Sequence, residues 1–313
     1  SSPCYIMIGD FTKFFDNLNH AYLKQQWCSL LGVSYLPPDH YAVYKNITRF
    51  STWELVDLLQ LNGLKDTKGD RRKLNSKLVV LPKDQFKSFR SHIQKSQNTF
   101  GIPQGSPMSA LLANVYMLEI DRHINEVVTS LGGLYMRYSD DFIIVLPFID
   151  EKKADDTLSN LTQYINSKPG LTLEPEKTQY FYYDSGHLEN CGSRFHADAD
   201  KGKRFINFLG FTFDGHKVSI RSKTISKYYY KMYRKARTIT KNGGYTHKGT
   251  RISGKNLYKR YSHHGAKSKK GNFLTYVMRS KQVFGDDELV ERDTRRHMQK
   301  IRRALNKKRK TSS

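Results

Sequence analysis

Residues 134–146 read LYMRYSDDFIIVL, and this stretch decides how the rest of the chain is interpreted. Two aspartates, Asp140 and Asp141, stand side by side between two runs that are apolar and rich in β-favouring residues. The pattern predicts a hairpin with both carboxylates at its turn. Adjacent like charges repel, and burying an unpaired carboxylate is costly. A fold tolerates the pair if a cation lies between the carboxylates or if water solvates both.

The composition is that of a folded protein with room for more than one domain. The chain has 313 residues, 38% of them hydrophobic, with 17 Phe and 20 Tyr. It contains no apolar run of about 18 residues, so no membrane-spanning helix is predicted, and it opens with no signal peptide. Because the first residue is not Met, we expect the sequence to be trimmed there. Three widely spaced cysteines, Cys4, Cys28 and Cys191, argue against a disulfide framework and for a reducing cytosol.

Nearly all of the net charge of +24 lies in the last third of the chain. Residues 221–313 contain 28 Lys and Arg against 5 Asp and Glu, whereas residues 1–220 are close to neutral. Aromatic residues alternate with these cations, as in SKYYYKMYRKARTITK and KNLYKRYSHHGAKSKK. Such a segment is typical of binding to a nucleic-acid backbone. The alternative, a solvated basic tail, suits NKKRKTSS at the end.

The order of expected elements is that of an α+β fold. A buried strand, PCYIMIGDF, comes before helices at 19–32, 53–63 and 84–97. A Gly/Pro loop then leads into a long helix that Ser106 caps and Pro107 begins. The apolar face of this helix is predicted to comprise Met108, Leu111, Leu112, Val115, Leu118 and Ile120. After the hairpin we expect a helix at 150–167, a strand in LTLEPEKTQYFYY, strands RFINFLGFTF and KVSIRS around Asp214-Gly215, and basic helices from about 223.

A third carboxylate gives the aspartate pair a chemical use. Asp10 stands at the end of the first apolar strand, and a neighbouring central strand could bring it beside Asp140 and Asp141. Three carboxylates facing one cleft offer oxygen ligands suited to two Mg²⁺ ions. Two such ions can stabilise the attacking and leaving oxygens of a phosphoryl transfer. The ions would also offset the repulsion between the carboxylates.

Five segments carry a further signal when they are taken in order. They are DFTKFFDNLNH, GIPQGSPMSALLANVYM, YSDD, LTLEPEKT and NFLGFTF. Together they resemble the successive catalytic blocks of reverse transcriptases, above all the bacterial enzymes of abortive infection and defence, retrons and group II introns. They occur in the order typical of the family and cover about residues 4–215. A lone YxDD would be a weak signal, but the ordered set is specific.

The resemblance implies roles for residues of the first and third blocks. Asp10, Asp140 and Asp141 match the metal-binding carboxylates, with Asp10 and Asp140 the direct ligands of both ions. The backbone of Phe11 would contact the metal-bound triphosphate. Phe15 matches the ring beneath the nucleotide sugar, where it blocks a 2′-OH and selects deoxynucleotides. For Phe15 the alternative is an ordinary core residue.

The other blocks imply further contacts. Gln104 matches the residue that touches the incoming nucleotide, and Gly101 and Gly105 let the backbone approach it closely. Lys177 matches the lysine that protonates the leaving pyrophosphate, although a loop lysine is often merely solvated. FINFLGF matches the hairpin that grips the primer end. The alternatives are a plain Gly/Pro turn for the glycines and a structural strand pair for FINFLGF.

The resemblance implies a right-hand polymerase palm, an antiparallel sheet with helices, followed by a basic helical thumb. We assign residues 1–220 to the palm with partial fingers and residues 221–313 to the thumb. Fingers normally precede the first block, and only nine residues precede Asp10, so they are largely absent here and we expect this segment alone to polymerise poorly. The cations expected to bind nucleic acid are Lys227, Lys231, Arg234 and Lys235.

One further cluster has a weaker pattern. HLENCGSRFH contains His187, Cys191 and His196, but three ligands at this spacing are a poor zinc signal. We interpret the segment as a surface insertion.

The resemblance implies an RNA-directed DNA polymerase that uses two Mg²⁺ ions, or Mn²⁺, and works in bacterial antiphage defence with a noncoding RNA. Its partners would be an RNA template, a DNA primer or product and deoxynucleotides, in the bacterial cytoplasm and without a membrane. A homo-oligomer or a protein partner stays open. Two rivals also stay open: a group II intron maturase and a non-catalytic RNA-binding scaffold. Phe15 and the YxDD form disfavour an RNA-directed RNA polymerase.

Overall fold

The computed structural model describes residues 2–148, 150–195, 204–241, 243–246, 249, 251–286 and 288–306. None of the helices in these ranges is long and apolar enough to cross a membrane. The chain divides into two compact units. The first unit comprises Ser1–Ile8, Ile143–Ala154 and Pro175–Ser313, and the second comprises Gly9–Phe142 and Asp155–Glu174.

A five-stranded sheet has the strand order β4-β5-β1-β6-β7. Its central strand β1 is almost wholly buried and runs antiparallel to β6, with Cys4 opposite Tyr183. Strand β5 alternates, and its side chains at every second position are fully buried. The predicted first strand and hairpin are therefore confirmed. The bounds are β1 (Cys4–Asp10), β4 (Leu134–Tyr138), β5 (Asp141–Pro147), β6 (Gln179–Asp184) and β7 (His187–Asn190).

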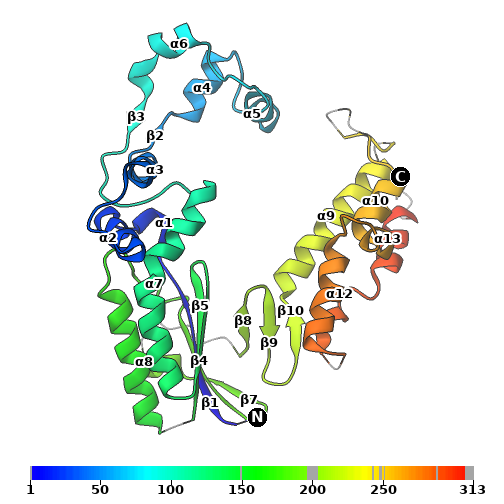
Figure 1. The fold of residues 1–313 in the computed structure, drawn as a ribbon. Helices are drawn as coiled ribbons and strands as arrows, with labels where there is room; N and C mark the ends of the chain where they lie inside the picture. The colour runs from blue at the N-terminus through cyan, green and yellow to red at the C-terminus, as the bar shows by residue number, and fades with distance from the viewer. Residues whose placement is uncertain are drawn as a thin grey trace. The chain divides into compact units, whose positions relative to one another are not determined.

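Helices α2 and α7 pack together in the second unit, and β4 packs against α7. Beyond α3, a ribbon of two short strands carries α4, α5 and α6, which lie together as a group (Figure 1). The bounds here are α1 (Phe14–Asn17), α2 (His20–Leu31), α3 (Pro38–Thr48), β2 (Ser51–Thr52), α4 (Leu55–Leu61), α5 (Lys68–Asn75), α6 (Lys83–Ser88), η1 (Arg90–His92), β3 (Gln94–Lys95), α7 (Pro107–Ser130) and α8 (Glu151–Asn166).

Several sequence-based boundaries in this unit need correction. The helix expected at 84–97 ends at Ser88, and Gln94–Lys95 instead pairs with Ser51–Thr52. Helices α3 and α5 were not predicted. In α7 the buried stripe includes Tyr116 and Met117, while Leu111 and Leu118 are 55% and 37% exposed. Ser106 does cap this helix, accepting a hydrogen bond from the Met108 amide.

The first unit continues with a three-stranded sheet of order β10-β9-β8. The apolar pattern of RFINFLGFTF predicted one strand, but the segment folds as two, because Leu209 and Gly210 both adopt positive φ and form a turn. The antiparallel pair β8–β9 is the strand pair expected for FINFLGF. Asp214-Gly215 does form the next turn. The bounds are η2 (Gly192–Arg194), β8 (Ile206–Phe208), β9 (Phe211–Phe213), β10 (Val218–Ile220), α9 (Ser222–Lys241), α10 (Gly254–Tyr261), α11 (His263–Ala266), α12 (Phe273–Phe284), η3 (Leu289–Glu291) and α13 (His297–Asn306).

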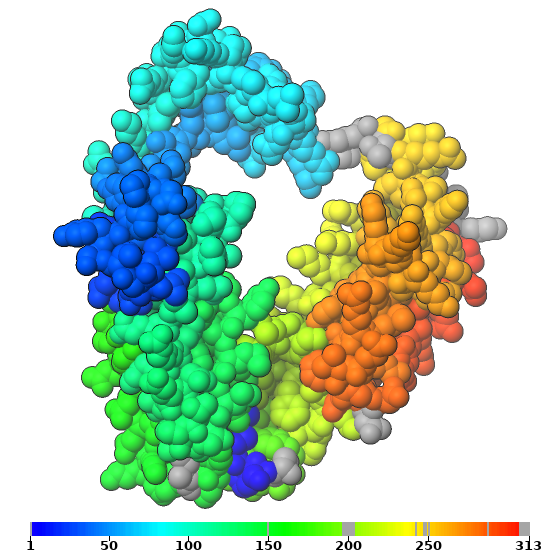
Figure 2. Space-filling model, in the orientation of Figure 1, coloured from blue at the N-terminus to red at the C-terminus, as the bar shows by residue number. Residues whose placement is uncertain are grey.

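The basic helices α9 to α13 share a core of their own. Met232, Leu257, Val277 and Ile301 are at most 1% exposed and belong to one cluster that begins at Ile220. Helices α10 and α12 contact each other, and their atoms, yellow to orange, lie together on the face seen in Figure 2. This core begins where the composition changes, although the two compact units divide the chain elsewhere. A thumb boundary near residue 221 therefore stays a prediction.

Candidate active site

The three aspartates singled out in the sequence lie at one end of the five-stranded sheet. Asp10 ends β1 and Asp141 begins β5, and these two strands are neighbours. The rings that follow them, Phe11 and Phe142, have centroids 5.6 Å apart, so the two strand ends meet. Asp140 occupies the turn before β5, and all three aspartates are half-buried. The ends of β1 and β5 that carry the three aspartates are thus neighbours, and water reaches all three side chains.

Gly9 makes this meeting of strand ends possible. A Cβ atom at position 9 would lie only 2.2 Å from Cζ of Phe142, which is fully buried. The phenyl ring therefore packs directly on the backbone that leads to Asp10. The sequence contains no signal for this contact, because it depends on the register of two strands that are far apart in the chain.

A buried ion pair supports the turn that carries Asp140. Arg137, whose side chain is 7% exposed, binds Asp121 of α7 through Nε and Nη2, at 2.8 and 2.7 Å. Its Nη1 donates to the carbonyl of Ser139 at 2.8 Å, and Ser139 adopts φ +60°. The hydroxyl of Tyr135 also donates to Asp121. The pKa of Tyr135 is raised, mainly because the ring is buried and secondly because the Asp121 carboxylate is close. These contacts fix the turn against α7.

The loop GIPQG lies against the short helix that contains Phe15. The amide of Ile102 donates to the carbonyl of Phe15 at 2.9 Å, and the amide of Gly101 donates to Leu18 at 2.8 Å. A Cβ at Gly101, where φ is +86°, would lie 2.8 Å from the carbonyl oxygen of Asp16. The structure thus brings together two blocks that are about 85 residues apart in the chain.

Phe15 differs from the two phenylalanines beside it. Phe14 is 3% exposed and stacks on the equally buried Phe11, with ring centroids 5.3 Å apart. Phe15 is half-buried and meets only the edge of Phe14 within this group. Phe14 therefore fills the core position, which leaves the ring of Phe15 partly accessible. Gln104 is exposed on the neighbouring loop.

Three further hydrogen bonds hold the chain segment that begins at Asp10. The amide of Glu174 donates to the carbonyl of Asp10 at 2.9 Å, and the hydroxyl of Thr12 donates to the Glu174 carboxylate at 3.1 Å. The hydroxyl of Tyr116 accepts from the Asn19 amide at 3.2 Å, and burial raises the pKa of Tyr116 to about 12. Glu174, Thr12 and Tyr116 were missed in the sequence because nothing in their spacing identifies them as partners.

Lys177 and the insertion segment belong to the first unit. Lys177 is exposed in the loop before β6. His187 is exposed on β7, whereas Cys191 is 6% exposed. His196 lies outside the described residues, so the zinc alternative is not tested.

The four cations expected to bind nucleic acid lie on one face of α9. Lys227, Lys231 and Arg234 are exposed and Lys235 is half-buried, while the opposite face packs into the core. Lys227 and Lys231 line a hollow of about 750 Å³, together with Lys259, Arg260 and Lys270 of other segments. The pKa of Lys235 is lowered, mainly because the side chain is partly buried and secondly because the charges of Arg260 and Arg234 are close. A bound phosphate would relieve this concentration of positive charge.

A family model described as reverse transcriptase (RNA-dependent DNA polymerase) matches residues 1–213. The chain belongs to the reverse transcriptase family. Its blocks from DFTKFFDNLNH to NFLGFTF all fall within the matched residues.

This reverse transcriptase resembles both a bacterial and several fungal proteins. It is 26% identical to the retron Mx162 reverse transcriptase of Myxococcus xanthus over 136 residues, which cover 41% of this chain and 28% of that one. Apo telomerase from Candida tropicalis, truncated from its C-terminal domain, matches at 16% identity and a TM-score of 0.39, over 71% of this chain and 36% of that chain. Telomerase from Candida albicans matches at 15% identity and a TM-score of 0.38, over 90% and 39%. The chain therefore spans well under half the length of these relatives.

Reverse transcriptases use divalent metal ions. Within the described ranges, no three Asp, Glu, His or Cys side chains gather closely enough to enclose an ion. Mg²⁺ does not need such a cage, because one or two carboxylates suffice where waters and substrate phosphates complete its shell. Asp10 and Asp140, half-buried at the ends of neighbouring strands, have the carboxylate oxygens that such an ion prefers. The residues therefore fit a substrate-completed metal site.

Proposed function

We propose that the protein is an RNA-directed DNA polymerase that adds deoxynucleotides to the 3′ end of a primer. The observation that carries the proposal is the meeting of the β1 and β5 ends, which bear Asp10 and Asp141, with Asp140 in the turn before β5. The contact between the Phe15 carbonyl and the Ile102 amide supports it, because a sugar gate and a nucleotide-binding loop must be neighbours.

The chain's own residues would hold and select the nucleotide. Asp10 and Asp140 would bind two Mg²⁺ ions, or Mn²⁺, with Asp141 beside them and the Phe11 backbone against the triphosphate. When bound, the ions stabilise negative charge on the attacking and leaving oxygens. Phe15 would exclude a 2′-OH by steric contact. Gln104 and Gly105 would position the nucleotide.

Lys177 and the basic helices complete the proposed machinery. Lys177 would donate a proton to the departing pyrophosphate. Lys227, Lys231, Arg234 and Lys235 would contact phosphates of the primer–template duplex, as a thumb does. We assign residues 1–220 to the palm, with partial fingers, and residues 221–313 to the thumb.

The proposed setting is bacterial antiphage defence, in the cytoplasm and with an associated noncoding RNA as template. The retron reverse transcriptase among the relatives supports a bacterial cellular role rather than a viral one. The three cysteines, none of which is in a disulfide, suit a reducing compartment.

The test is DNA synthesis on an RNA template by the full-length protein. Asp140→Asn keeps the shape of the side chain but removes its charge, so we expect incorporation to fall by several orders of magnitude while folding and RNA binding persist. Asp156→Asn, at an exposed position of α8, is the matched control and should leave synthesis unchanged. If Asp140→Asn synthesised DNA at nearly the wild-type rate, a non-catalytic scaffold would become the better description.

A further inference from the structure

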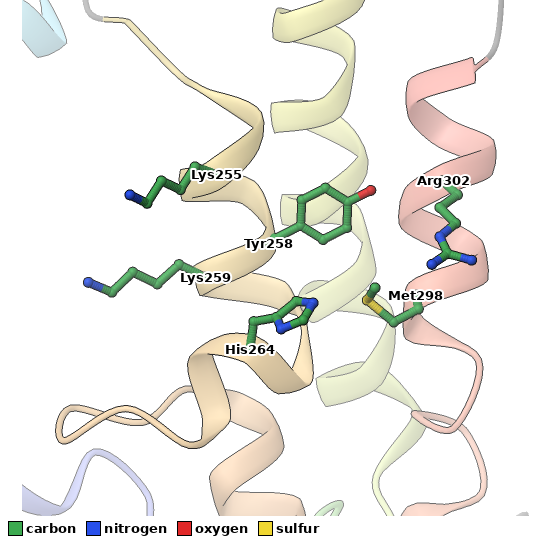
Figure 3. A pocket seen from close by; sticks show the side chains of 6 residues that line it. All are labelled: Lys255, Tyr258, Lys259, His264, Met298 and Arg302. Carbon is green, nitrogen blue, oxygen red and sulfur yellow. The ribbon is translucent and has the colours of Figure 1, made fainter.

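A second pocket, of about 570 Å³, lies on the basic helices and shares Lys259 with the hollow beside α9. It is lined by Lys255, Tyr258, Lys259, His264, Met298 and Arg302. Figure 3 shows the Tyr258 ring between α10 and α13, with His264, Met298 and Arg302 around it. Lys255 and Lys259 extend from α10 with their ammonium groups pointing away from that ring. The pocket therefore has an aromatic interior and a cationic rim.

The side chains of this pocket match the parts of a nucleotide. Tyr258 and Met298 are half-buried and offer apolar surface, and the rings of Tyr258 and His264 are 6.4 Å apart at 75°. Aromatic rings of this kind stack with nucleobases, and the volume is that of an ordinary ligand pocket. The rim carries Lys255, Lys259 and Arg302, and none of the lining residues is acidic. Cations and rings in one pocket favour a ligand with both phosphate and a flat base.

We propose that this pocket binds an unpaired nucleotide of a single-stranded nucleic acid. A base inside a duplex is stacked on both faces and cannot present a face to Tyr258, whereas an unpaired base can. Lys259 lines both this pocket and the hollow that contains Lys227 and Lys231. A strand that leaves a duplex held along α9 would cross Lys259 and place its next base against Tyr258. This proposal rests on the proposed function in one respect, which is that the protein binds nucleic acid. It does not require the protein to polymerise DNA.

The test compares single-stranded and duplex oligonucleotides on the full-length protein. Tyr258→Leu keeps apolar contact with the helix core but removes the stacking ring. We expect affinity for a short single-stranded RNA, or DNA of the same sequence, to fall about tenfold while affinity for the blunt duplex is unchanged. Arg302→Gln should weaken the single strand alone, and Arg303→Gln, on the same helix and outside the pocket lining, is the matched control. Unchanged single-strand affinity in a folded Tyr258→Leu protein would overturn the proposal.

A photocrosslinking experiment on the unaltered protein keeps the proposal testable if Tyr258→Leu fails to fold. An oligonucleotide with 5-iodouracil in its unpaired part should crosslink to Tyr258, His264 or Met298, and crosslinks confined to other peptides would exclude the pocket. Free uridine monophosphate is the competitor. If it displaced the oligonucleotide at equal concentration, the pocket would take a free nucleotide rather than a strand. Primer extension measured in parallel separates failure of the pocket from failure of the polymerase assignment.

Discussion

Phe15 is the residue whose environment most directly suggests a test. Its ring is half-buried beside the fully packed Phe14, so a smaller side chain there removes steric bulk without opening the core. We expect Phe15→Val to allow ribonucleotide addition while deoxynucleotide addition weakens only modestly. Phe15→Tyr retains the ring and should retain selection. Single-nucleotide extension with each class of triphosphate measures the ratio, and equal use of both classes by the wild type would reject the assignment to DNA synthesis.

Phe14 gives the contrasting prediction one position away. Because its ring is 3% exposed and stacks on Phe11, Phe14→Ala should lower the free energy of unfolding by about 3–5 kcal/mol. Urea unfolding followed by circular dichroism measures this loss. A Phe14→Ala protein of unchanged stability with altered nucleotide choice would mean that the gate is Phe14 and that Phe15 is incidental.

The pair Arg137–Asp121 should couple stability to activity. Asp121→Ala leaves the guanidinium of Arg137 buried without its carboxylate, which should cost about 3 kcal/mol. The turn of Asp140 would also lose its attachment to α7, so DNA synthesis should fall at temperatures where the protein is still folded. Thermal unfolding and extension rate are measured on the same sample. The double variant Asp121→Ala with Arg137→Met should recover stability but not activity.

At the scale of elements, the junction of α2, α7 and the loop after α8 contains a pH-sensitive carboxylate. Glu119 accepts from Gln26 at 2.7 Å and from Lys168 at 3.3 Å, and these partners, Gln26 first, lower its pKa below 4.5. A lowered carboxyl pKa stabilises the fold above pH 4.5, and the contribution is lost as the pH falls through the folded value.

We therefore expect the stability advantage of wild type over Glu119→Gln to shrink between pH 6 and pH 3. Urea unfolding at pH 6, 4.5 and 3 measures it. Gln26→Met removes the main hydrogen-bond donor to Glu119. It should therefore weaken the pH dependence of stability over the same interval. An advantage that is constant across this range would show that the ionised form of Glu119 does not matter to the junction.

Elements with a strong local pattern could be predicted from the sequence. The strand before Asp10 and the capped helix after Pro107 are of this kind, because apolar periodicity and capping residues are local signals. The β2–β3 ribbon has only two exposed residues in each strand and so leaves no periodic pattern. The apolar pattern alone made RFINFLGFTF one strand, because its turn begins at Leu209, a residue type that seldom adopts positive φ. The resemblance gave the strand pair correctly.

The residues of the candidate site could be predicted from the motifs, but not the contacts that position them. Gly9 against Phe142, Arg137 with Asp121 and Ile102 with Phe15 each join segments that meet only after the chain has folded. Their residue types are common, and no spacing identifies the pairs. Sequence motifs therefore suggest the chemistry proposed for the site, whereas the structure shows the contacts that position its residues.

For the whole molecule, the concentration of positive charge in the last third predicts that the affinity for nucleic acid falls as the salt concentration rises. Replacing Lys227, Lys231, Arg234 and Lys235 by Gln should reduce the slope of log affinity against log salt by about 3.6, at about 0.9 for each of four phosphate contacts. Products should also shorten. Duplex binding between 50 and 300 mM salt measures the slope. Lys45→Gln with Lys152→Gln, exposed cations outside the basic third, should leave it unchanged.

The antiparallel pairing of Cys4 with Tyr183 also means that the two paired strands are synthesised at very different times. The two partners are 179 residues apart, so the first strand leaves the ribosome long before β6 exists. At translation rates of about 5–20 residues per second, the wait is roughly 10 to 35 seconds. Until β5 is made, the apolar run CYIMIGDF has no neighbouring strand of its sheet, and it is open on its β6 side for the whole wait, which exposes the nascent chain to aggregation. Slowing translation between residues 11 and 178 should therefore raise aggregation, and slowing it after residue 190 should not.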